Sequence, residues 1–547
     1  MKKRISMIAA SLSIGLFLSQ PLPSYALSDE VLNVYHEGKA QMKVQQIARY
    51  DSQSGEGGTE IFSYDQTSKK GYVTNGAEAA IDIIDFKSID RNEKLTSSKR
   101  VFLADFGMDK VSDITSIAAH PTKNLIAVSV VSEPKTEQGY VVFLTKEGEY
   151  LTSVKVGSLP DMVTFTSDGK SVLTANEGEP NDDYSENPEG SVSIISVPAS
   201  IKKDAKLKVT NAKFTNRVKI DRNVRKNSKG TLAEQFEPEY IKVSKDSKYA
   251  YVVLQENNGI AKLNLQTKKF ERVYGLGFKD HSLKKNSMDA VKDDEINLEQ
   301  FPLLGMYQPD GIDSFTVNNK EYIITPNEGD ARDYDGYSEE GTIADIKDQI
   351  HLNAKYYKGF SQKQLNQLVN DGLLDQLEDM KITLEDGKKK DGTYEALYVH
   401  GGRSFSIYEA KSMKQVYDSG NEFEKITATA LPDYFNTDND KIKKDARSNA
   451  KGPEPESAVV GKIGKKLYAF IGLERTSGIM VYDVTNPKKA EFVSFFSSRD
   501  YRDKIKGDVA PEGLQFIEAK GSPTRKPLLV ATHEMSGTIA VYEIGIK

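Results

Sequence analysis

The chain has 547 residues, of which 38% are hydrophobic and 28% charged, so it can bury a large core and stay soluble. Its 80 acidic residues exceed its 74 basic ones, giving a formal charge of −6. This balance argues against nucleic acid as a partner, because phosphate backbones need a concentrated basic surface. The absence of cysteine excludes disulfides, so we expect stability to come from the core or from bound metal.

Residues 1–26 have the features of a secretory signal peptide. A basic start at residues 2–4 precedes an apolar run at 5–18, and small residues then allow cleavage after Ala26. The apolar run is too short for a stable membrane-spanning helix. We therefore expect residues 27–547 to be secreted, or loosely associated with a cell wall, as a monomer without a membrane span.

The remaining chain is rich in short β-branched runs separated by turn residues, a pattern typical of many short antiparallel strands. One repeat unit is clear at residues 161–197. Its first two strands, 162–166 and 171–175, flank a Ser-Asp-Gly-Lys turn, and a third strand follows at 190–197. Related units begin near residues 60, 113, 239, 310, 456 and 512.

Seven such units predict an all-β fold, a seven-bladed β-propeller over residues 27–547 in which each blade buries the faces of its neighbours. The strand-like segment 42–50 is expected to complete the last blade and close the ring. The fifth unit is interrupted at about 342–394 by a predicted helical insertion, where Ser361 and Gln364 match a capping box.

Acidic residues recur at fixed places in the units. In a hairpin, the start of the first strand and the end of the second lie at the same end of the sheet. The acidic residues at those places should therefore gather around one mouth of the central channel, with further ones from two similar loops, 176–184 and 327–334. The candidate metal ligands are Glu60, Glu78, Asp161, Glu177, Glu179, Asp183, Glu239, Glu256, Asp310, Glu328, Asp330, Asp333, Glu456, Glu474, Glu512 and Glu534.

Oxygen ligands in excess favour calcium or magnesium over zinc, and calcium is the expected cofactor. The alternative for any single carboxylate is a structural role, in which it caps backbone N–H groups or pairs with arginine. Three arginines lie beside the same mouth in the repeat register: Arg332, Arg403 and Arg475. They could orient a phosphate group beside bound calcium, or they could neutralise the carboxylates through salt bridges.

Several segments resemble the choice-of-anchor I domain, a family similar to mesenchyme-specific cell-surface glycoproteins. They are 176–180, 308–312, 327–332, 402–407, 451–456, 472–475 and 511–514. The resemblance implies an extracellular or surface propeller, and some relatives are labelled alkaline-phosphatase-like. Family members often carry a C-terminal anchor that is not evident here, which favours release or loose wall association. The second unit lacks a Pro-Glu pair, so a gap in the acidic ring is expected.

Three functions remain open. The first is a secreted calcium-binding propeller with a surface, matrix or scavenging role. The second is a calcium-dependent phosphohydrolase that uses a metal-activated water on a phosphate-containing small molecule. The third is a metal-free interaction scaffold, for example one that binds a cell-wall component. No nucleophile motif is present, so a hydrolase would need the metal.

Overall fold

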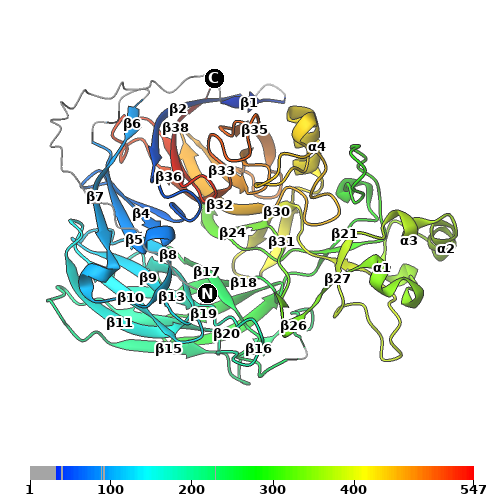
Figure 1. Cartoon of the computed structure of the whole chain (residues 1–547), viewed down its shortest axis with the longest axis horizontal. Coiled ribbons are helices and arrows are strands. Elements are labelled where there is room, and N and C mark those ends of the chain that lie inside the picture. The colour runs from blue at the N-terminus through cyan, green and yellow to red at the C-terminus, as the bar shows by residue number, and fades with distance from the viewer. Residues whose placement is uncertain (1–31, 38–40, 88, 90–92, 228, 547) are drawn as a thin grey trace, which may run out of the picture.

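The protein is represented by a computed structural model, and the structure is described here for residues 32–37, 41–87, 89, 93–227 and 229–546. The predicted signal peptide lies outside the described residues. Within them, seven sheets have four or five strands each, and Figure 1 shows these sheets arranged around a central axis. None of the described helices is long and apolar enough to cross a membrane.

The first four sheets follow one another along the chain. The first contains β3 (Phe62–Asp65), β4 (Lys70–Asn75), β5 (Ala80–Asp85) and β7 (Ser97–Phe102). The second contains β8 (Val111–Ala119), β9 (Ile126–Ser132), β10 (Gln138–Leu144) and β11 (Tyr150–Ser158). The third contains β12 (Pro160–Phe165), β13 (Ser171–Asn176), β14 (Ser191–Ser196) and β15 (Val209–Lys213). The fourth contains β17 (Pro238–Val243), β18 (Tyr249–Leu254), β19 (Gly259–Asn264), β20 (Lys269–Gly275) and β16 (Lys219–Ile220).

The last three sheets draw on more distant segments. The fifth contains β23 (Asp313–Val317), β24 (Lys320–Asn327), β30 (Ser404–Glu409) and β31 (Lys414–Asp418). The sixth contains β32 (Pro455–Ile463), β33 (Lys466–Leu473), β34 (Gly478–Asp483), β35 (Glu491–Ser497) and β1 (Asn33–Tyr35). The seventh contains β36 (Pro511–Ile517), β37 (Leu528–His533), β38 (Thr538–Ile546), β2 (Met42–Asp51) and β6 (Glu93–Leu95).

The middle strands of the sheets are buried on both faces, because each sheet is covered by its two neighbours. Strand β9 is an example: its sequence, IAVSVVS, is nearly all apolar and every residue in it is buried. Such strands therefore show continuous apolar runs rather than alternation. The predicted hairpin turn between β12 and β13 is confirmed. Gly169 has a φ of +66° and donates its N–H to the Thr166 carbonyl at 2.8 Å.

The innermost strands surround one central cavity. Strand β3 packs against β8, β8 against β12, β12 against β17, β23 against β32, β32 against β36, and β36 against β3. Residues from all seven innermost strands line one central cavity. The prediction that segment 42–50 completes the last sheet is confirmed, since β2 pairs with β38 from Met42 to Asp51. The described residues therefore form a β-propeller closed by a strand from the N-terminal side.

A helical segment separates β24 from β30, although these two strands pair directly. It contains β25 (Asp333–Tyr334), β26 (Tyr337–Ser338), β27 (Glu340–Thr342), α1 (Ile343–Ile346), α2 (Gln362–Asn370), α3 (Leu373–Gln376), β28 (Lys381–Thr383) and β29 (Tyr398–Val399). Strands β21 (Phe278–Asp280) and β22 (Leu304–Met306) join β29, and α4 (Glu422–Ala430) follows β31. The predicted capping box is confirmed, because Ser361 caps α2 and Gln364 bonds back to its N–H. Figure 1 shows α2 and α3 outside the ring of sheets.

Candidate metal centre

The acidic residues of the mouth are positioned by irregularities in the innermost strands. Strands β12, β17, β32 and β36 each begin with a proline that an acidic residue follows, and the pairing register shifts just after that proline. Proline fits there because it has no N–H to give to the ladder. The extra residue of a β-bulge bends the strand and re-aims a side chain. The repeated Pro-acid pair thus turns a carboxylate toward the channel in sheet after sheet.

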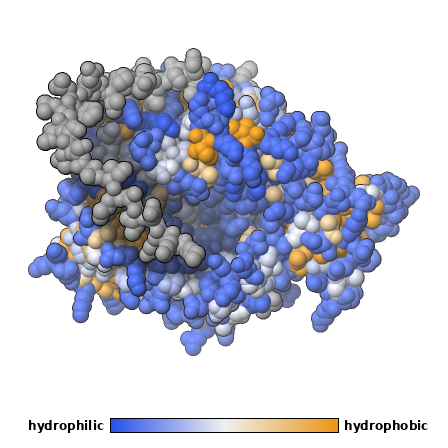
Figure 2. Space-filling view, viewed as in Figure 1, coloured by the Kyte–Doolittle hydropathy of each residue, from blue (hydrophilic) through white to orange (hydrophobic). Residues whose placement is uncertain are grey.

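These carboxylates line a cavity of about 220 Å³ at the mouth of the channel, which we call the chamber. Its acidic lining comes from six of the seven sheets: Glu60, Asp113, Asp161, Asp310, Glu456, Glu512 and Glu534. Tyr240 lies between the chamber and the wider central cavity and contributes to the lining of both. Figure 2 shows a largely hydrophilic face with a hollow near its middle.

Three groups of carboxylates have ligand atoms that all lie within 4.8 Å of one another. The central group is Asp310, Glu456 and Glu512; the side group is Glu177, Glu239 and Glu256; the paired group is Glu328, Glu454 and Glu474. Like charges at this separation repel unless cations or protons compensate them. The three groups differ in what compensates them.

The central group lies in the chamber wall and has no cationic partner. Among the described residues, no Lys, Arg or His nitrogen forms an ion pair with any of its three carboxylates. Burial and the charge of Glu328 raise the pKa of Asp310 to about 8. Burial also raises the pKa values of Glu456 and Glu512 well above the usual range, and neighbouring carboxylates add to this. The group therefore binds protons readily and offers three oxygen ligands to a metal ion.

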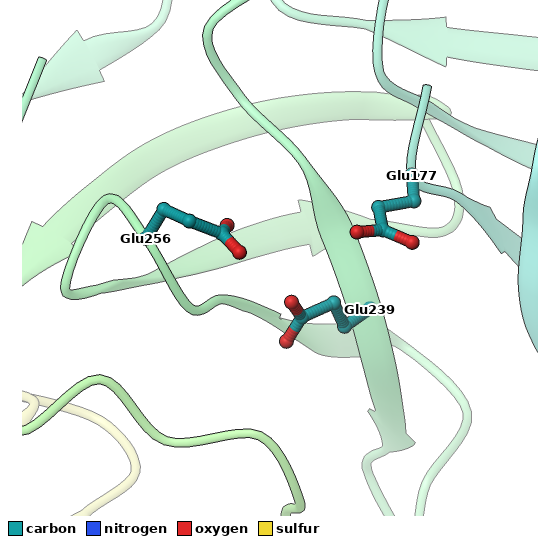
Figure 3. A group of neighbouring side chains, drawn as sticks. All are labelled: Glu177, Glu239 and Glu256. Atoms are coloured by element: carbon teal, nitrogen blue, oxygen red, sulfur yellow. The ribbon is translucent and has the colours of Figure 1, made fainter. Parts of the chain in front are cut away.

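The side group lies beside the central group and is drawn in Figure 3, where its three carboxylates point toward one another. Glu177 follows β13, Glu239 lies at the start of β17 and Glu256 follows β18. Burial raises the pKa values of all three well above the usual range, and the charges of neighbouring carboxylates add to this. The nearest guanidinium nitrogen, Nη2 of Arg332, is 3.9 Å from Glu256 Oε2, which exceeds hydrogen-bond distance.

The paired group carries its own cations. The Lys451 ammonium lies 2.8 Å from Glu328 and 3.1 Å from Glu454. Arg475 lies 3.1 Å from both Glu454 and Glu474, and Arg447 lies 2.6 Å from Glu454. Burial alone would raise the pKa of Glu454, but these cations lower it to about 2. The protein's own cations therefore offset much of the charge of the paired group, although burial and the charges of Glu454 and Glu328 raise the pKa of Glu474 to about 8.

The structure does not bring every predicted ligand into these groups. Glu179 pairs with Lys135 at 2.6 Å, and Asp330 lies 3.7 Å from Lys451. Glu78, Asp183 and Asp333 are exposed and belong to none of the three groups. They lie on exposed parts of their loops, and the repeat register does not determine a loop's path.

Two acidic residues were missed by sequence reasoning. Asp113 fills the predicted gap in the ring, within an irregular stretch of β8. Its signal was its position at the start of the second unit, but Ser112 stands where five of the other six units have proline. Glu454 was missed because it precedes the Pro455-Glu456 pair rather than belonging to it.

The three arginines predicted beside the mouth are occupied by protein acceptors. Arg403 donates to Glu424 at 2.8 Å and to the carbonyl oxygens of Asp289, Ser448 and Ala450. Arg332 donates to Glu237 at 2.6 Å, and Arg475 is held in the paired group. These contacts favour the salt-bridge alternative over phosphate binding.

Comparison with curated proteins finds two distant relatives. The chain is 29% identical over 198 residues to Gigasin-3a of Magallana gigas, covering 34% of this chain and 69% of that protein. It is 30% identical over 104 residues to the mesenchyme-specific cell surface glycoprotein of Strongylocentrotus purpuratus, covering 17% of this chain. The match spans only 13% of that glycoprotein's length.

Among solved structures, the chain is similar to hydrazine synthase of Kuenenia stuttgartiensis, with 11% identity, a TM-score of 0.44, and 89% and 95% of the two chains covered. It is also similar to the Cps50 (Swd1) β-propeller domain of Myceliophteria thermophila, with 5% identity, a TM-score of 0.42, and 92% and 99% covered. The family model of the choice-of-anchor I domain matches residues 60–487, which include innermost strands from six of the seven sheets. The chain therefore belongs to the choice-of-anchor I domain family.

Proposed function

We propose that this protein is an extracellular propeller that binds a divalent cation, calcium, at the central group. The proposal is carried by one observation: seven carboxylates line a single chamber, and none of them forms an ion pair in the described part of the chain. A buried carboxylate without a partner costs several kcal/mol, roughly, unless it is protonated or bound to a metal. A divalent ion held by Asp310, Glu456 and Glu512 would remove that cost.

The donor set supports calcium over zinc or copper. The central group offers only carboxylate oxygens, and no histidine lines the chamber. Hard cations such as Ca²⁺ and Mg²⁺ take such ligands, whereas zinc prefers histidine and cysteine. Calcium accepts six to eight ligands with flexible geometry, which suits a ring of carboxylates contributed by separate sheets.

Two observations support an extracellular location. Residues 1–26 carry the pattern of a signal peptide, and one relative is named a cell surface glycoprotein. We infer a role at a surface, in a matrix or in scavenging cations. We also infer that the seven sheets are the seven blades of the propeller, and that residues 342–394 are a helical insertion in the fifth blade.

Calorimetric titration with calcium, together with thermal unfolding, tests the proposal. The wild-type chain should bind calcium, and calcium at about 100 times its dissociation constant should stabilise the fold by about 2.7 kcal/mol. The double variant Glu456→Gln/Glu512→Gln should lose the central site. Its melting temperature in chelator should be unchanged or higher, because two repelling carboxylates, Glu456 buried and Glu512 half-buried, are gone.

The matched control is Glu409→Gln/Glu543→Gln, which removes two carboxylates that pair with Lys320 and Lys526 away from the mouth. This control should bind calcium like the wild type. If calcium neither binds nor stabilises the wild-type chain, the proposal is wrong and the metal-free scaffold is the better account. If the control loses calcium as fully as the chamber variant, the central group is not the site.

A further inference from the structure

The paired group shows how this mouth accommodates several carboxylates when a cation is supplied. Two of its members, Glu328 and Glu474, follow the second strands of their sheets, as Glu177 and Glu256 do in theirs. In the paired group, the Lys451 ammonium sits among Glu328, Glu454 and Asp330 at distances of 2.8, 3.1 and 3.7 Å. The Lys451 ammonium thus occupies the position that a bound cation would take among these carboxylates.

The side group has no such residue. Arg332 is engaged by Glu237 at 2.6 Å and lies 3.9 Å from Glu339. Arg225 is engaged by Glu339 and Asp386. Within the described chain, no ion pair includes Glu177 or Glu239, and Glu256 has only the distant Arg332. The two nearby guanidinium groups, of Arg225 and Arg332, therefore pair with carboxylates outside the side group. The side group has no cation of its own to balance its negative charge.

Two oxygen atoms of the side group also lack hydrogen-bond partners. Glu239 and Glu256 are each only 6% exposed, and in both residues the Oε2 atom is buried without a partner. Buried polar atoms in native proteins nearly always have a partner, and an unpartnered one points to an unseen ion or water. In Figure 3 both carboxylates face the space that they share with Glu177.

We infer that the side group is a second cation site, distinct from the central group, in which Glu177, Glu239 and Glu256 together bind one Ca²⁺. The inference rests on the proposed cation-binding function of the mouth. Calcium–oxygen distances are about 2.4 Å, so oxygens on opposite sides of one ion lie about 4.8 Å apart. The ligand atoms of the side group all lie within 4.8 Å of one another, so one point is at most about 2.8 Å from all three, and shifts of a few tenths of an ångström bring them to calcium–oxygen distance.

The two loops that were similar in sequence close over this neighbourhood. Tyr334 donates its hydroxyl to Glu179 at 2.9 Å, and the ring of Tyr184 packs edge-on against both Tyr334 and Tyr337. The Gly336 N–H bonds to the Asp182 carbonyl at 2.9 Å. We expect these contacts, which we call the clasp, to limit the access of water, so that the second ion has fewer water ligands and exchanges more slowly than an ion in the chamber.

Binding stoichiometry measured by calorimetry with calcium alone tests the inference. The wild-type chain should bind two ions, and Glu177→Gln/Glu256→Gln should bind one. Glu456→Gln/Glu512→Gln should also bind one, whereas the control Glu409→Gln/Glu543→Gln should bind two. Glu239 is left intact because its carboxylate lies close to Asp310 of the central group.

The same titrations distinguish an error about the second site from an error about the central site. If Glu177→Gln/Glu256→Gln still binds as many ions as the wild type, the second site is wrong while the central site stands. If the wild type binds no ion, both are wrong. If it binds one ion that only the Glu456→Gln/Glu512→Gln variant loses, the side group holds protons rather than calcium.

Terbium is a luminescent substitute for calcium. Its tyrosine-sensitised emission tests the second site even if Glu177→Gln/Glu256→Gln does not fold. The chain has no tryptophan, so only tyrosines can transfer energy to bound terbium efficiently. In the Glu456→Gln/Glu512→Gln background, Tyr334→Phe should reduce the sensitised emission at least twofold. The control Tyr468→Phe, at the far end of β33, should leave it unchanged. Equal emission in both variants would contradict a terbium ion near the clasp.

Discussion

The ammonium nitrogen of Lys451 lies 2.8 Å from Glu328 Oε1, although the two residues are 123 positions apart in the chain. The lysine comes from the loop before β32 and the glutamate from the end of β24. This contact supplies a positive charge to the paired group without a metal. In the described part of the chain, no lysine forms an ion pair with the central or the side group. The distribution of basic residues around the ring thus separates carboxylates that the protein pairs from those that it leaves for an ion.

Replacing Lys451 by methionine should be strongly destabilising. Breaking a buried ion pair by removing one partner typically costs about 3–5 kcal/mol. Urea unfolding should show a loss of that size in chelator and a smaller loss in calcium, because the ion can take the place of the ammonium. The control is Lys526→Met, which removes a lysine whose side chain is 51% exposed beside Glu543. Exposed pairs are worth about 0–1 kcal/mol, so equal losses in both variants would contradict this view.

Stability without calcium should fall as the pH rises. The pKa of Asp161 is raised to about 7 and that of Asp310 to about 8, from about 3.9 for an unfolded aspartate. Between about pH 4 and pH 8 the folded chain therefore holds protons that the unfolded chain has lost. Under this condition the free energy of unfolding decreases with pH, and the other mouth carboxylates whose pKa values are raised by burial, Glu456 and Glu512 among them, contribute in the same direction.

Calcium should reverse that trend, since it competes with these protons and binds more tightly as they leave. Melting temperatures measured from pH 5 to pH 9 with calcium and with chelator should therefore diverge as the pH rises. The variant Asp161→Asn/Asp310→Asn should show a flatter curve in chelator. Parallel curves for the wild type with and without calcium would contradict the coupling between protons and the metal.

Arg403 is expected to act on stability rather than on ligand binding. Its guanidinium is buried and bonded to Glu424 and three carbonyl oxygens, so Arg403→Met should cost about 3–5 kcal/mol. Calcium affinity of the folded fraction should be unchanged, and the exposed Arg217→Met should have little effect on either property. Weaker phosphate binding by Arg403→Met at normal stability would instead support the phosphohydrolase alternative.

The closure of the ring can be tested by a cross-link, because the chain has no cysteine of its own. Gln45 of β2 and Glu543 of β38 are register partners. The pair Gln45→Cys/Glu543→Cys should form a disulfide that stabilises the oxidised protein by about 2–4 kcal/mol over the reduced one. Each single cysteine variant serves as a control. Identical stability of the oxidised and reduced pair would argue that closure by β2 does not limit unfolding.

Much of the propeller could be predicted from the sequence, because each repeat unit has similar residue types at its strand starts and turns. Pro238-Glu239, Pro455-Glu456 and Pro511-Glu512 mark the starts of innermost strands, and the structure places all three acids at the mouth. The closing strand was predicted from the strand-like sequence of segment 42–50, and β2 pairs with β38 as expected. Local spacing carries this kind of information well.

Contacts between loops that are far apart in the chain could not be predicted from the sequence. Nothing near Lys451 indicates that it reaches Glu328, and nothing near Arg403 indicates Glu424 or the carbonyl oxygens that surround it. Asp113 was overlooked because a serine replaced the expected proline. Glu78, Asp183 and Asp333 were misplaced because they follow the strand ends, where the path of the loop decides their position. Tertiary packing, rather than the repeat, determines these features.

The most direct test is an anomalous difference map from crystals of the protein grown with calcium and then exchanged with terbium. The account predicts a peak in the chamber with Asp310, Glu456 and Glu512 oxygens about 2.3–2.6 Å away, and no peak at the paired group, where Lys451 supplies the charge. A chamber without a peak, under conditions that saturate the protein in solution, would contradict the claim that the acidic mouth binds a cation.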